Sequence, residues 1–302
     1  MNGNEQLCGI LNVYKPQDWT SFDVIAKLRG LLKIKRLGHA GTLDPMATGV
    51  LPVFVGKATK ACDIIPDNFK EYAAGFELGI STDTEDITGR VLERSDKAVE
   101  RTQLEKAAQS FVGDIIQIPP MYSAVKVNGK KLYEYAREGK VIEREARPVH
   151  IDSIDIIEYD ERTRRGRLAV NCRKGTYVRT IISDIGKLLG TGGAMTSLER
   201  TYSGGCGIAD SLTLEQIAEY CGKGEIGEHI TPLDKAFYEY GEIKLGQRLT
   251  ELYKNGVKLY PNQLTDGKSP DDKLYRVYGA DGAFLGIGRF EKELFRSVKN
   301  FY

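Results

Sequence analysis

The order of the strand-forming and helix-forming segments constrains the fold of this 302-residue chain more than any other feature. Short or alternating apolar runs that end at turn residues predict strands over residues 10–14, 51–55, 72–78, 122–127, 151–157 and 168–172. Apolar residues at helical spacing predict helices over 22–32, 104–111 and 178–189, and a fourth helix near Thr213. The strands outnumber the helices and do not alternate regularly with them. This order predicts an α+β fold with a mixed, mainly antiparallel central sheet flanked by helices, in preference to a doubly wound parallel sheet.

Capping signals support the first two helices. Thr20 and Ser21 directly precede the helix over 22–32. Thr102 and Glu105 have the Ser/Thr-x-x-Glu spacing of a capping box, in which each side chain satisfies a free backbone N–H. We therefore expect helices to begin at these two points.

The chain is long enough for one large domain and a smaller second one. The pattern changes beyond about residue 240, where residues 274–278 and 283–290 form two strand-like segments around the turn Ala280-Asp281-Gly282. We expect a large domain over residues 1–240 and a small β-rich module over residues 241–302.

Composition excludes several classes of protein. The five cysteines are scattered, with no Cys-x-x-Cys pair and none beside a histidine, so no zinc site or other metal site is expected. No stretch approaches the roughly 20 apolar residues that cross a bilayer, so no membrane partner is expected. Residues 1–7 are polar and lack the apolar core of a secretory signal, which predicts a cytoplasmic protein.

Basic residues gather in three places although the formal net charge is only +1. Five lie between Lys27 and Arg36, a second group flanks the Asn128-Gly129 turn, and a third surrounds the segment 168–172. Exposed lysine and arginine usually serve solubility. Three such clusters on an almost neutral chain are nevertheless typical of a protein that contacts RNA phosphates. Their number favours RNA without identifying which RNA.

The stretch 38–52 holds three glycines and two prolines directly after a basic helix, which suppresses regular structure there. Pro45 disfavours helical backbone at Asp44, so the carboxylate would project from a fixed, extended backbone, as a preorganised nucleophile requires. The alternative is an ordinary Asp-Pro turn in which the side chain bonds its own backbone. The residues alone leave both interpretations open.

The same stretch closely resembles the signature G-H-x-G-T-L-D-P-x-A-T-G-V-L of the TruB family of tRNA pseudouridine synthases, in which the aspartate is catalytic. The resemblance covers residues from about 9 to 235. A weaker one, carried mainly by residues 284–288, links the end of the chain to the PUA-like module of bacterial members. The further matching segments, in the family's order, are Lys15-Pro16, Lys70-x-Tyr72, Leu78-Gly79, Thr82-Asp83-Thr84, Pro119-Pro120-x-Tyr122-Ser123-Ala124-Val125-Lys126 and Lys174-Gly175-Thr176-Tyr177-Val178-Arg179.

The resemblance implies a role for each matching site residue. Asp44 would be the nucleophile, either by attack on the base or by assisting departure of the base from the sugar. Arg179 would pair with its carboxylate or, alternatively, contact a phosphate. Tyr72 would stack on the target base and act with these two in catalysis. The other implied site residues are Tyr177 and Leu198, which would line the pocket; His39, which would contact the RNA where the base has left; and Lys15, Pro16, Gly38 and Thr42, which would support the active-site loop.

The resemblance also implies the fold, the reaction and the substrate. A pseudouridine synthase fold would flip uridine 55 out of the T-loop of tRNA and isomerise it to pseudouridine without a cofactor. The partner would be the T-arm of tRNA, with no obligatory protein partner, and a monomer is expected. Residues 126–148 resemble the family's thumb-like insertion that grips the T-loop.

Two departures from the family pattern are expected near the edge of the pocket. Glu199 stands where the family commonly has arginine, and Ala194 where it often has histidine; Glu199 would repel a nearby phosphate. Two alternative functions stay open: a guide-RNA-dependent synthase subunit that works inside a ribonucleoprotein, and a non-catalytic chaperone that unfolds and refolds tRNA.

Overall fold

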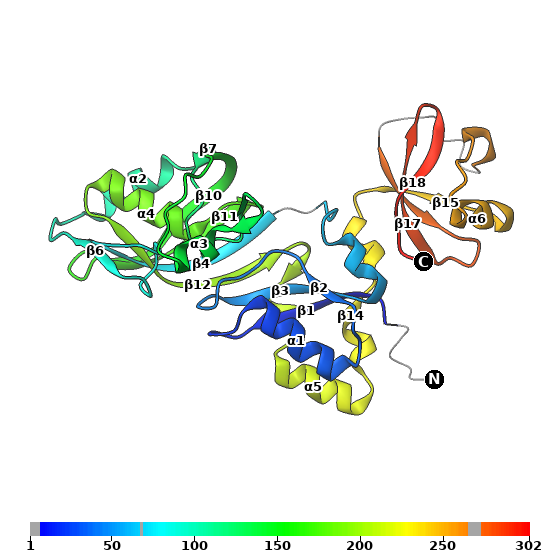
Figure 1. Cartoon of the computed structure of the whole chain (residues 1–302), viewed down its shortest axis with the longest axis horizontal. Helices are drawn as coiled ribbons and strands as arrows, with labels where there is room; N and C mark the ends of the chain where they lie inside the picture. The colour runs from blue at the N-terminus through cyan, green and yellow to red at the C-terminus, as the bar shows by residue number, and fades with distance from the viewer. Residues whose placement is uncertain (1–6, 67–68, 265–272) are drawn as a thin grey trace.

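The computed structural model describes residues 7–66, 69–264 and 273–302. They form a large sheet of ten strands and a separate four-stranded sheet at the end of the chain (Figure 1). Among the described residues, β12 and β3 are the one parallel pair of the large sheet, and its other pairs are antiparallel. The predicted α+β fold with a mixed, mainly antiparallel sheet is confirmed.

In spatial order the large sheet runs β14 (Ile230–Thr231), β1 (Gly9–Lys15), β3 (Thr48–Val55), β12 (Gly193–Ser203), β4 (Phe69–Leu78), β11 (Arg165–Arg173), β10 (Arg147–Asp160) and β7 (Gly113–Gln117). The short strand β2 (Leu37–His39) lies beside β3, and β13 (Cys206–Gly207) lies beside β12.

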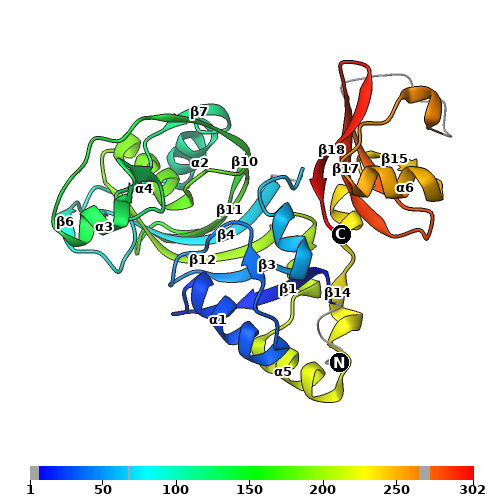
Figure 2. The same cartoon turned by 45° about the vertical axis from the view of Figure 1, so that its right-hand side comes forward.

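Two pairs of helices cover the two halves of this sheet. The helices α1 (Ser21–Leu32) and α5 (Leu214–Lys223) pack on β1 and β3, and α2 (Arg101–Gln109) and α4 (Val178–Leu189) pack on β4, β10 and β11. Both cartoon views place one pair above the sheet and the other below it (Figures 1 and 2). The sheet therefore has two separate hydrophobic cores, which meet where β3, β12 and β4 run side by side.

The remaining elements are short. The strands β5 (Ile80–Thr82) and β6 (Val91–Arg94) form a two-stranded ribbon. None of the helices in the described part of the chain has both the length and the apolar character needed to cross a membrane. The 3-10 helices are η2 (Gly56–Ala61), η3 (Ile208–Asp210), η4 (Ile226–His229), η5 (Leu233–Phe237) and η6 (Pro261–Gln263).

The helix ends follow local chemistry, with one correction. Thr20 caps α1 as predicted, because its side chain accepts from the N–H of Asp23 and Asp23 accepts in return. The predicted capping box before α2 is wrong. This helix begins at Arg101, and its box joins Glu100 to Gln103, because the buried Val99 brings the chain into the core one turn earlier.

The strand predicted over 122–127 is also wrong, apart from its last two residues. Only β8 (Lys126–Val127) forms, and it pairs with β9 (Lys130–Lys131). The carbonyls before β8 bond to other partners: Val125 accepts from the N–H of Leu132, and Tyr122 accepts from Arg179. Backbone groups bonded in this way are not free for a sheet ladder.

The long strand β12 was not predicted, although it lies in the middle of the sheet. Its pairing with β4 shifts register twice, between Met195 and Ser197 and again between Arg200 and Tyr202. A β-bulge adds an unpaired residue and breaks the alternation of inward and outward side chains. The period-of-two signal that reveals a strand is therefore absent from this segment.

The insertion over 126–148 begins with the hairpin β8–β9 and continues into α3 (Leu132–Arg137). Leu132 is fully buried and fixes the start of the helix. The side chains around it are basic and aromatic: Lys131 and Arg137 lie over the ring of Tyr133, at 5.4 and 5.3 Å from its centre. The insertion thus presents cations on an aromatic surface.

The C-terminal module has its own core and a fixed junction with the large domain. Its sheet consists of β15 (Gly241–Lys244), β16 (Leu274–Tyr278), β17 (Phe284–Glu291) and β18 (Leu294–Asn300), beside α6 (Gln247–Lys254). At the junction, Phe237 stacks on Phe301, and Lys299 pairs with Asp63 at 3.0 Å. Because these contacts join the module to β1 and β3 through one hydrophobic cluster, its position relative to the large domain is determined by packing.

Candidate active site

Asp44 lies on the loop between β2 and β3, where the chain crosses from one core of the sheet to the other. Leu43 and Ala47 are buried in the core beneath α4, whereas β3 belongs to the core beneath α1. Ser21, at the start of α1, holds this crossing, because its hydroxyl accepts from the N–H of Leu43 at 2.9 Å. Asp44 is thereby held at the seam between the two halves of the domain.

The carboxylate of Asp44 forms an ion pair with Arg179 in the first turn of α4. The Nε atom of Arg179 lies 3.0 Å from Oδ2 of Asp44, and the arginine side chain is only 4% exposed while 38% of the aspartate side chain remains open. Burial raises the pKa of the Asp44 carboxyl above its usual range, although the positive charge of Arg179 opposes this rise. The result is a preoriented carboxylate that faces outward from a buried cation.

Arg179 is itself fixed in three directions. Its Nη1 donates to the carbonyl of Thr84 at 3.0 Å, and its Nη2 donates to the carbonyl of Tyr122 at 2.9 Å. The second bond ties Arg179 to Tyr122, four residues before the insertion. A planar guanidinium can serve all three partners at once, which an ammonium cannot.

A second carboxylate, Asp86, lies behind the same guanidinium and was not predicted. Its Oδ2 is 3.8 Å from Nη1 of Arg179, and the residue is 5% exposed. Its other oxygen accepts from the hydroxyl of Thr84 at 2.9 Å and from the N–H of Thr88 at 2.9 Å. Asp86 is one of the charges that raise the pKa of Asp44. Asp86 lies two residues beyond Thr82-Asp83-Thr84, the nearest segment that resembles the family.

Lys15 holds the other side of the Asp44 loop. Its ammonium is fully buried and donates to the carbonyls of Pro16 at 2.8 Å, Trp19 at 2.6 Å and Pro45 at 3.2 Å. Burial lowers the pKa of Lys15 to about 8, with the charge of Asp44 opposing this effect. The lysine therefore links the end of β1 to the residue after Asp44.

Arg200 on β12 is a third buried cation and was missed in the sequence. It is fully buried, and it donates to the carbonyl of Val50 at 2.7 Å and to that of Gly41 at 3.0 Å, on either side of Asp44. The backbone is close here as well: a Cβ on Gly49 would lie 2.3 Å from the carbonyl oxygen of Arg200, so glycine is required. Only the pairing of β12 with β3 brings Arg200 to this loop, and no local sequence signal indicates that pairing.

The residues expected around the target base are distributed as follows. Tyr72 and Leu198 are both buried and share one hydrophobic cluster with Leu43 and Ala47 of the loop. Burial raises the pKa of the Tyr72 hydroxyl, and Asp44 adds to the rise. Tyr177 lies immediately before α4, where its backbone bonds to the side chain of Gln117.

His39 ends β2, and its ring is partly buried. Burial lowers the pKa of its imidazole, and the charge of Arg200 lowers it further. Its Nδ1 is buried and has no hydrogen-bond partner among the described residues. The imidazole is thus held in its neutral form beside the loop.

Two of the supporting residues have a weaker structural basis. Thr42 is exposed, and a Cβ on Gly38 would meet its nearest atom, Sγ of Cys62, at an ordinary 3.4 Å. Pro16 contributes its carbonyl to Lys15. Packing alone therefore does not require glycine at position 38.

The two departures from the family pattern lie in different surroundings. Glu199 accepts a hydrogen bond from the hydroxyl of Tyr14 at 2.8 Å. Ala194 is fully buried, and it pairs with Glu77 of β4. Along β12, Ala194 lies four residues before Leu198, which is roughly 14 Å in an extended strand. Ala194 is therefore a core residue, next to Met195, which bridges to Asp86; its place at the edge of the pocket stays a prediction.

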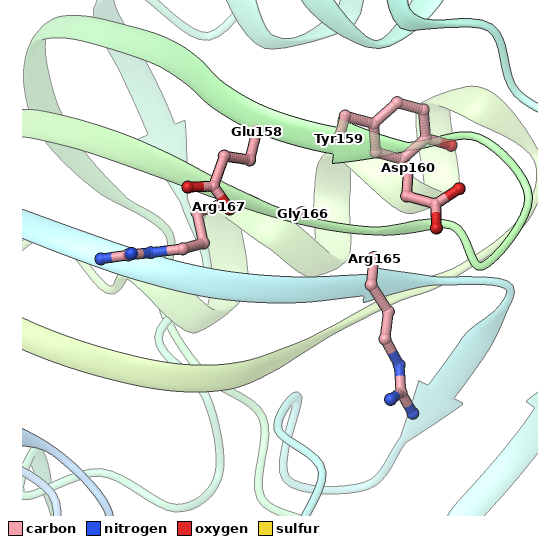
Figure 3. Close-up of a pocket in the computed structure, with 6 residues that line it drawn as sticks. All are labelled: Glu158, Tyr159, Asp160, Arg165, Gly166 and Arg167. Atoms are coloured by element: carbon pink, nitrogen blue, oxygen red, sulfur yellow. The ribbon is translucent and has the colours of Figure 1, made fainter.

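A separate surface hollow lies at the far end of the β10–β11 hairpin and is not part of this site (Figure 3). It is lined by Tyr159, Arg165 and their neighbours. Arg165 pairs with Glu77 of β4, and Glu77 lies five residues after Tyr72 on that strand. That separation is roughly 17 Å along the strand. Within the described ranges, no group of three or more His, Cys, Asp or Glu side chains is arranged to hold a metal ion.

Comparison with known proteins identifies the class of this fold. Residues 29–178 match the N-terminal domain of the TruB family of pseudouridylate synthases, and residues 179–238 match the C-terminal domain of tRNA pseudouridylate synthase B. The Cbf5 fold is also similar: a chain from the crystal structure of a Cbf5-Nop10-Gar1 complex superposes with a TM-score of 0.75 at 24% identity, covering 99% of this chain and 86% of that one. A second, from the archaeal box H/ACA sRNP Nop10-Cbf5 complex, has a TM-score of 0.72 at 22% identity, with 99% and 90% coverage. At these identities the likeness concerns the fold alone.

The sequence relatives are closer. A protein of Clostridium tetani named tRNA pseudouridine synthase B is 44% identical over 292 residues, which cover 96% of this chain and 98% of the relative. The protein of that name from Levilactobacillus brevis is 39% identical over 300 residues, with 97% and 98% coverage. The chain belongs to the TruB family of pseudouridylate synthases.

Proposed function

We propose that this protein is a tRNA pseudouridine synthase that isomerises uridine 55 in the T-loop, with Asp44 as its nucleophile. The ion pair between Asp44 and the buried Arg179 is the observation that carries the proposal. It supplies a carboxylate that is fixed in direction and open on one side, as nucleophilic catalysis requires. The names of the relatives support tRNA as the substrate.

The reaction needs a nucleophile and a route for one proton. The bond between N1 and C1′ breaks, the base turns, and C5 joins C1′; C5 gives up its hydrogen as a proton, and N1 takes up a proton, so that the product is an isomer of uridine. A carboxylate can assist by adding to the base or by displacing it from C1′. Both routes start from ionised Asp44. Arg179 favours that state, since an adjacent cation stabilises a carboxylate against the cost of burial.

The target base must leave its stack to reach Asp44, because a base inside a folded loop is inaccessible. Tyr72 offers an aromatic surface and Leu198 an aliphatic one, in the hydrophobic cluster that includes the buried residues of the Asp44 loop. Tyr177 lies two residues before Arg179. We assign the stacking of the flipped base to Tyr72 and the opposite wall to Leu198. His39 is assigned to the space that the base leaves, and Lys15 with Pro16 is assigned to support of the loop.

The insertion is assigned to the grip on the T-arm. Its cation-aromatic pairs, such as Lys130 with Tyr135 at 4.8 Å, combine phosphate contacts with surfaces on which bases can stack. The bond from Arg179 to the carbonyl of Tyr122, four residues before this segment, connects the chain that leads into it to the proposed nucleophile. RNA that moves the insertion would therefore also act on the ion pair.

The test is release of tritium from C5-labelled uridine in an unmodified tRNA transcript, with no other protein or RNA present. We expect release by the natural protein, none by Asp44→Asn, and near-normal release by Asp155→Asn, an exposed aspartate on β10 that serves as the matched control. A transcript with cytidine at position 55 should lose its label no faster than without enzyme. The Asp44→Asn protein should still bind tRNA, because the substitution keeps the shape and removes the charge.

Other outcomes would favour the other functions. Release only when a guide RNA and partner proteins are added would indicate a guide-dependent synthase. Tight tRNA binding by the natural protein without any release would indicate a tRNA-folding chaperone. Weak tRNA binding by Asp44→Asn would show that Asp44 has a structural role.

A further inference from the structure

Two cationic side chains meet behind the active-site loop at a glycine. A Cβ placed on Gly41 would lie 3.0 Å from Nζ of Lys70 and 3.1 Å from Nη1 of Arg200, so both nitrogens face one point beside the loop. Gly41 has a backbone φ of +74°, which a residue with a side chain rarely adopts. The close approach of the two cations to the backbone therefore depends on glycine at this position.

Within the described part of the chain, neither nitrogen that faces this point has a hydrogen bond of normal geometry, although the hydroxyl of Tyr72 lies near the guanidinium of Arg200. Nη1 of Arg200 is buried and has no hydrogen bond among the described residues, although the other two guanidinium nitrogens are bonded. In the same residues, no salt bridge to a carboxylate is found for Lys70 or Arg200, and the cations Arg200 and Lys174 are among the charges that act on the pKa of Lys70. Buried charges are normally paired, since an unpaired ion loses its hydration without compensation. Two cationic nitrogens that face one point in this way are suited to binding an anion.

The strand register places these cations next to the proposed base pocket. Lys70 and Tyr72 are two residues apart on β4, so they lie on the same face of the strand, roughly 7 Å apart. Arg200 on β12 pairs directly with Tyr72, and directly paired residues share a face. A ligand that places a base on Tyr72 and an anion at Lys70 must hold the two groups about 7 Å apart. A nucleotide does so with its own base and backbone phosphate.

We propose that Lys70 and Arg200 form a subsite for one backbone phosphodiester of the RNA substrate, at or next to the nucleotide that is flipped. Lys70, which is partly exposed, makes the contact, while the fully buried Arg200 supplies positive charge behind it and holds the loop at Gly41. This proposal rests on the proposed function, because it takes RNA as the substrate. The subsite would hold the sugar-phosphate backbone in place while the uridine base rotates.

Groups that titrate near Lys70 give the subsite a pH dependence. Burial, together with the positive charges of Arg200 and Lys174, lowers the pKa of Lys70 to about 8. The titratable neighbours of Lys70 on its own strand are Glu71 and Tyr72. Cys172 pairs with Lys70 from β11 and stays neutral, because burial raises the pKa of its thiol to about 11. An arriving phosphate raises the lysine pKa again. RNA binding above pH 8 should therefore take up one proton and weaken as the pH rises.

The first experiment measures the affinity for a T-arm hairpin in an Asp44→Asn background, so that the RNA is not consumed. Lys70→Met keeps the length of the side chain and removes the charge, Lys70→Arg keeps the charge, and Lys106→Met on the exposed face of α2 is the control. We expect Lys70→Met to bind about tenfold more weakly or worse, as for a lost bond to a charged group. Its salt dependence should be less steep by about one phosphate contact. Lys70→Arg and Lys106→Met should stay close to the parent protein.

The second experiment identifies the phosphate. Each phosphodiester of the hairpin loop is replaced in turn by a neutral methylphosphonate. One replacement should weaken binding to the parent protein as much as Lys70→Met does, and it should have no further effect on Lys70→Met. If every replacement adds independently to the effect of Lys70→Met, no phosphate is bound at Lys70 and the proposal is wrong.

The third experiment measures affinity between pH 7 and pH 9. The parent protein should lose affinity through this range, and Lys70→Arg should not. Lys15, whose pKa is also lowered to about 8, is bonded to three carbonyls and is unchanged in both proteins, so the difference reports Lys70 alone. Equal pH profiles would overturn the proposal.

Turnover separates failure of this inference from failure of the proposed function. With Asp44 intact, Lys70→Met should need about tenfold more RNA than the natural protein to reach half of its maximal rate of tritium release, in line with its loss of affinity. A slow rate at saturation, with affinity unchanged, would place Lys70 in the chemistry and refute the subsite. Absence of release by the natural protein would reject the proposed function itself, whatever the hairpin affinities show.

Discussion

Replacing Arg179 by lysine should damage both the chemistry and the stability of the domain, although it conserves the charge. The guanidinium has three bonded partners, the carboxylate of Asp44 and the carbonyls of Thr84 and Tyr122, at 3.0, 3.0 and 2.9 Å. A lysine has one nitrogen on a flexible stem and cannot reach partners that lie in three directions. At least two of the three acceptors would lose their donor.

The expected size follows from those losses. A buried acceptor left without a donor costs roughly 1–3 kcal/mol, so two of them should lower the free energy of unfolding by about 3 kcal/mol. That is less than the total stability of a typical domain, so the variant should still fold. The rate of the chemical step should fall as well, by roughly 100-fold, because displacing a reacting group by about 1 Å can cost that much.

Two assays separate these effects. Urea unfolding gives the loss of stability, and tritium release in a single turnover with enzyme in excess gives the chemical step without substrate binding or product release. Arg162→Lys, on an exposed turn between β10 and β11, is the matched control and should match the natural protein in both assays. A natural single-turnover rate for Arg179→Lys would refute the argument that the planar guanidinium positions Asp44.

Two further predictions concern the neighbours of Asp44. Tyr72→Phe keeps the ring, so it should retain much more single-turnover activity than Tyr72→Ala if stacking is the main role; equal losses would show that the hydroxyl is the essential group. Asp86→Asn removes a negative charge that raises the pKa of Asp44, so the acid limb of the single-turnover rate, measured between pH 4 and pH 7, should move to lower pH. Activity falls with acid in both proteins because Asp44 must be ionised, and a limb that stays in place would contradict the assigned coupling.

The sequence predicts well what depends on neighbouring residues. The end of α4 at Leu189 follows from Gly190, which adopts the left-handed conformation that closes a helix, and the start of α1 follows from the Thr20 cap. The loop around Asp44 was identified only in part in the same way: Gly41 and Pro45 lie between the strands, whereas Gly38, Gly49 and Pro52, which were expected to suppress regular structure, lie within β2 and β3. Each of these signals lies within a few residues of the feature that it specifies.

Features that depend on distant pairing could not be predicted in this way. The strand β12 carries two bulges, so its inward and outward residues do not alternate, and its neighbours β3 and β4 lie more than 100 residues earlier in the chain. Arg200 was missed for the same reason, since its two carbonyl partners, Val50 and Gly41, become its neighbours only when β12 inserts beside β3. A lone arginine in sequence is far more often exposed than buried.

The arrangement of the buried cations is compatible with the role proposed for Asp44. Lys15 and Arg200 fix the two flanks of the loop through backbone carbonyls, and Arg179 alone among these three pairs with the carboxylate. Had all three contacted Asp44, its charge would have been neutralised and its pKa strongly lowered, which would reduce its nucleophilicity. Because two cations bind carbonyls instead, the loop is rigid while the carboxylate keeps one counter-ion and one open side. Two of these cations therefore hold the backbone, and the third pairs with the proposed nucleophile.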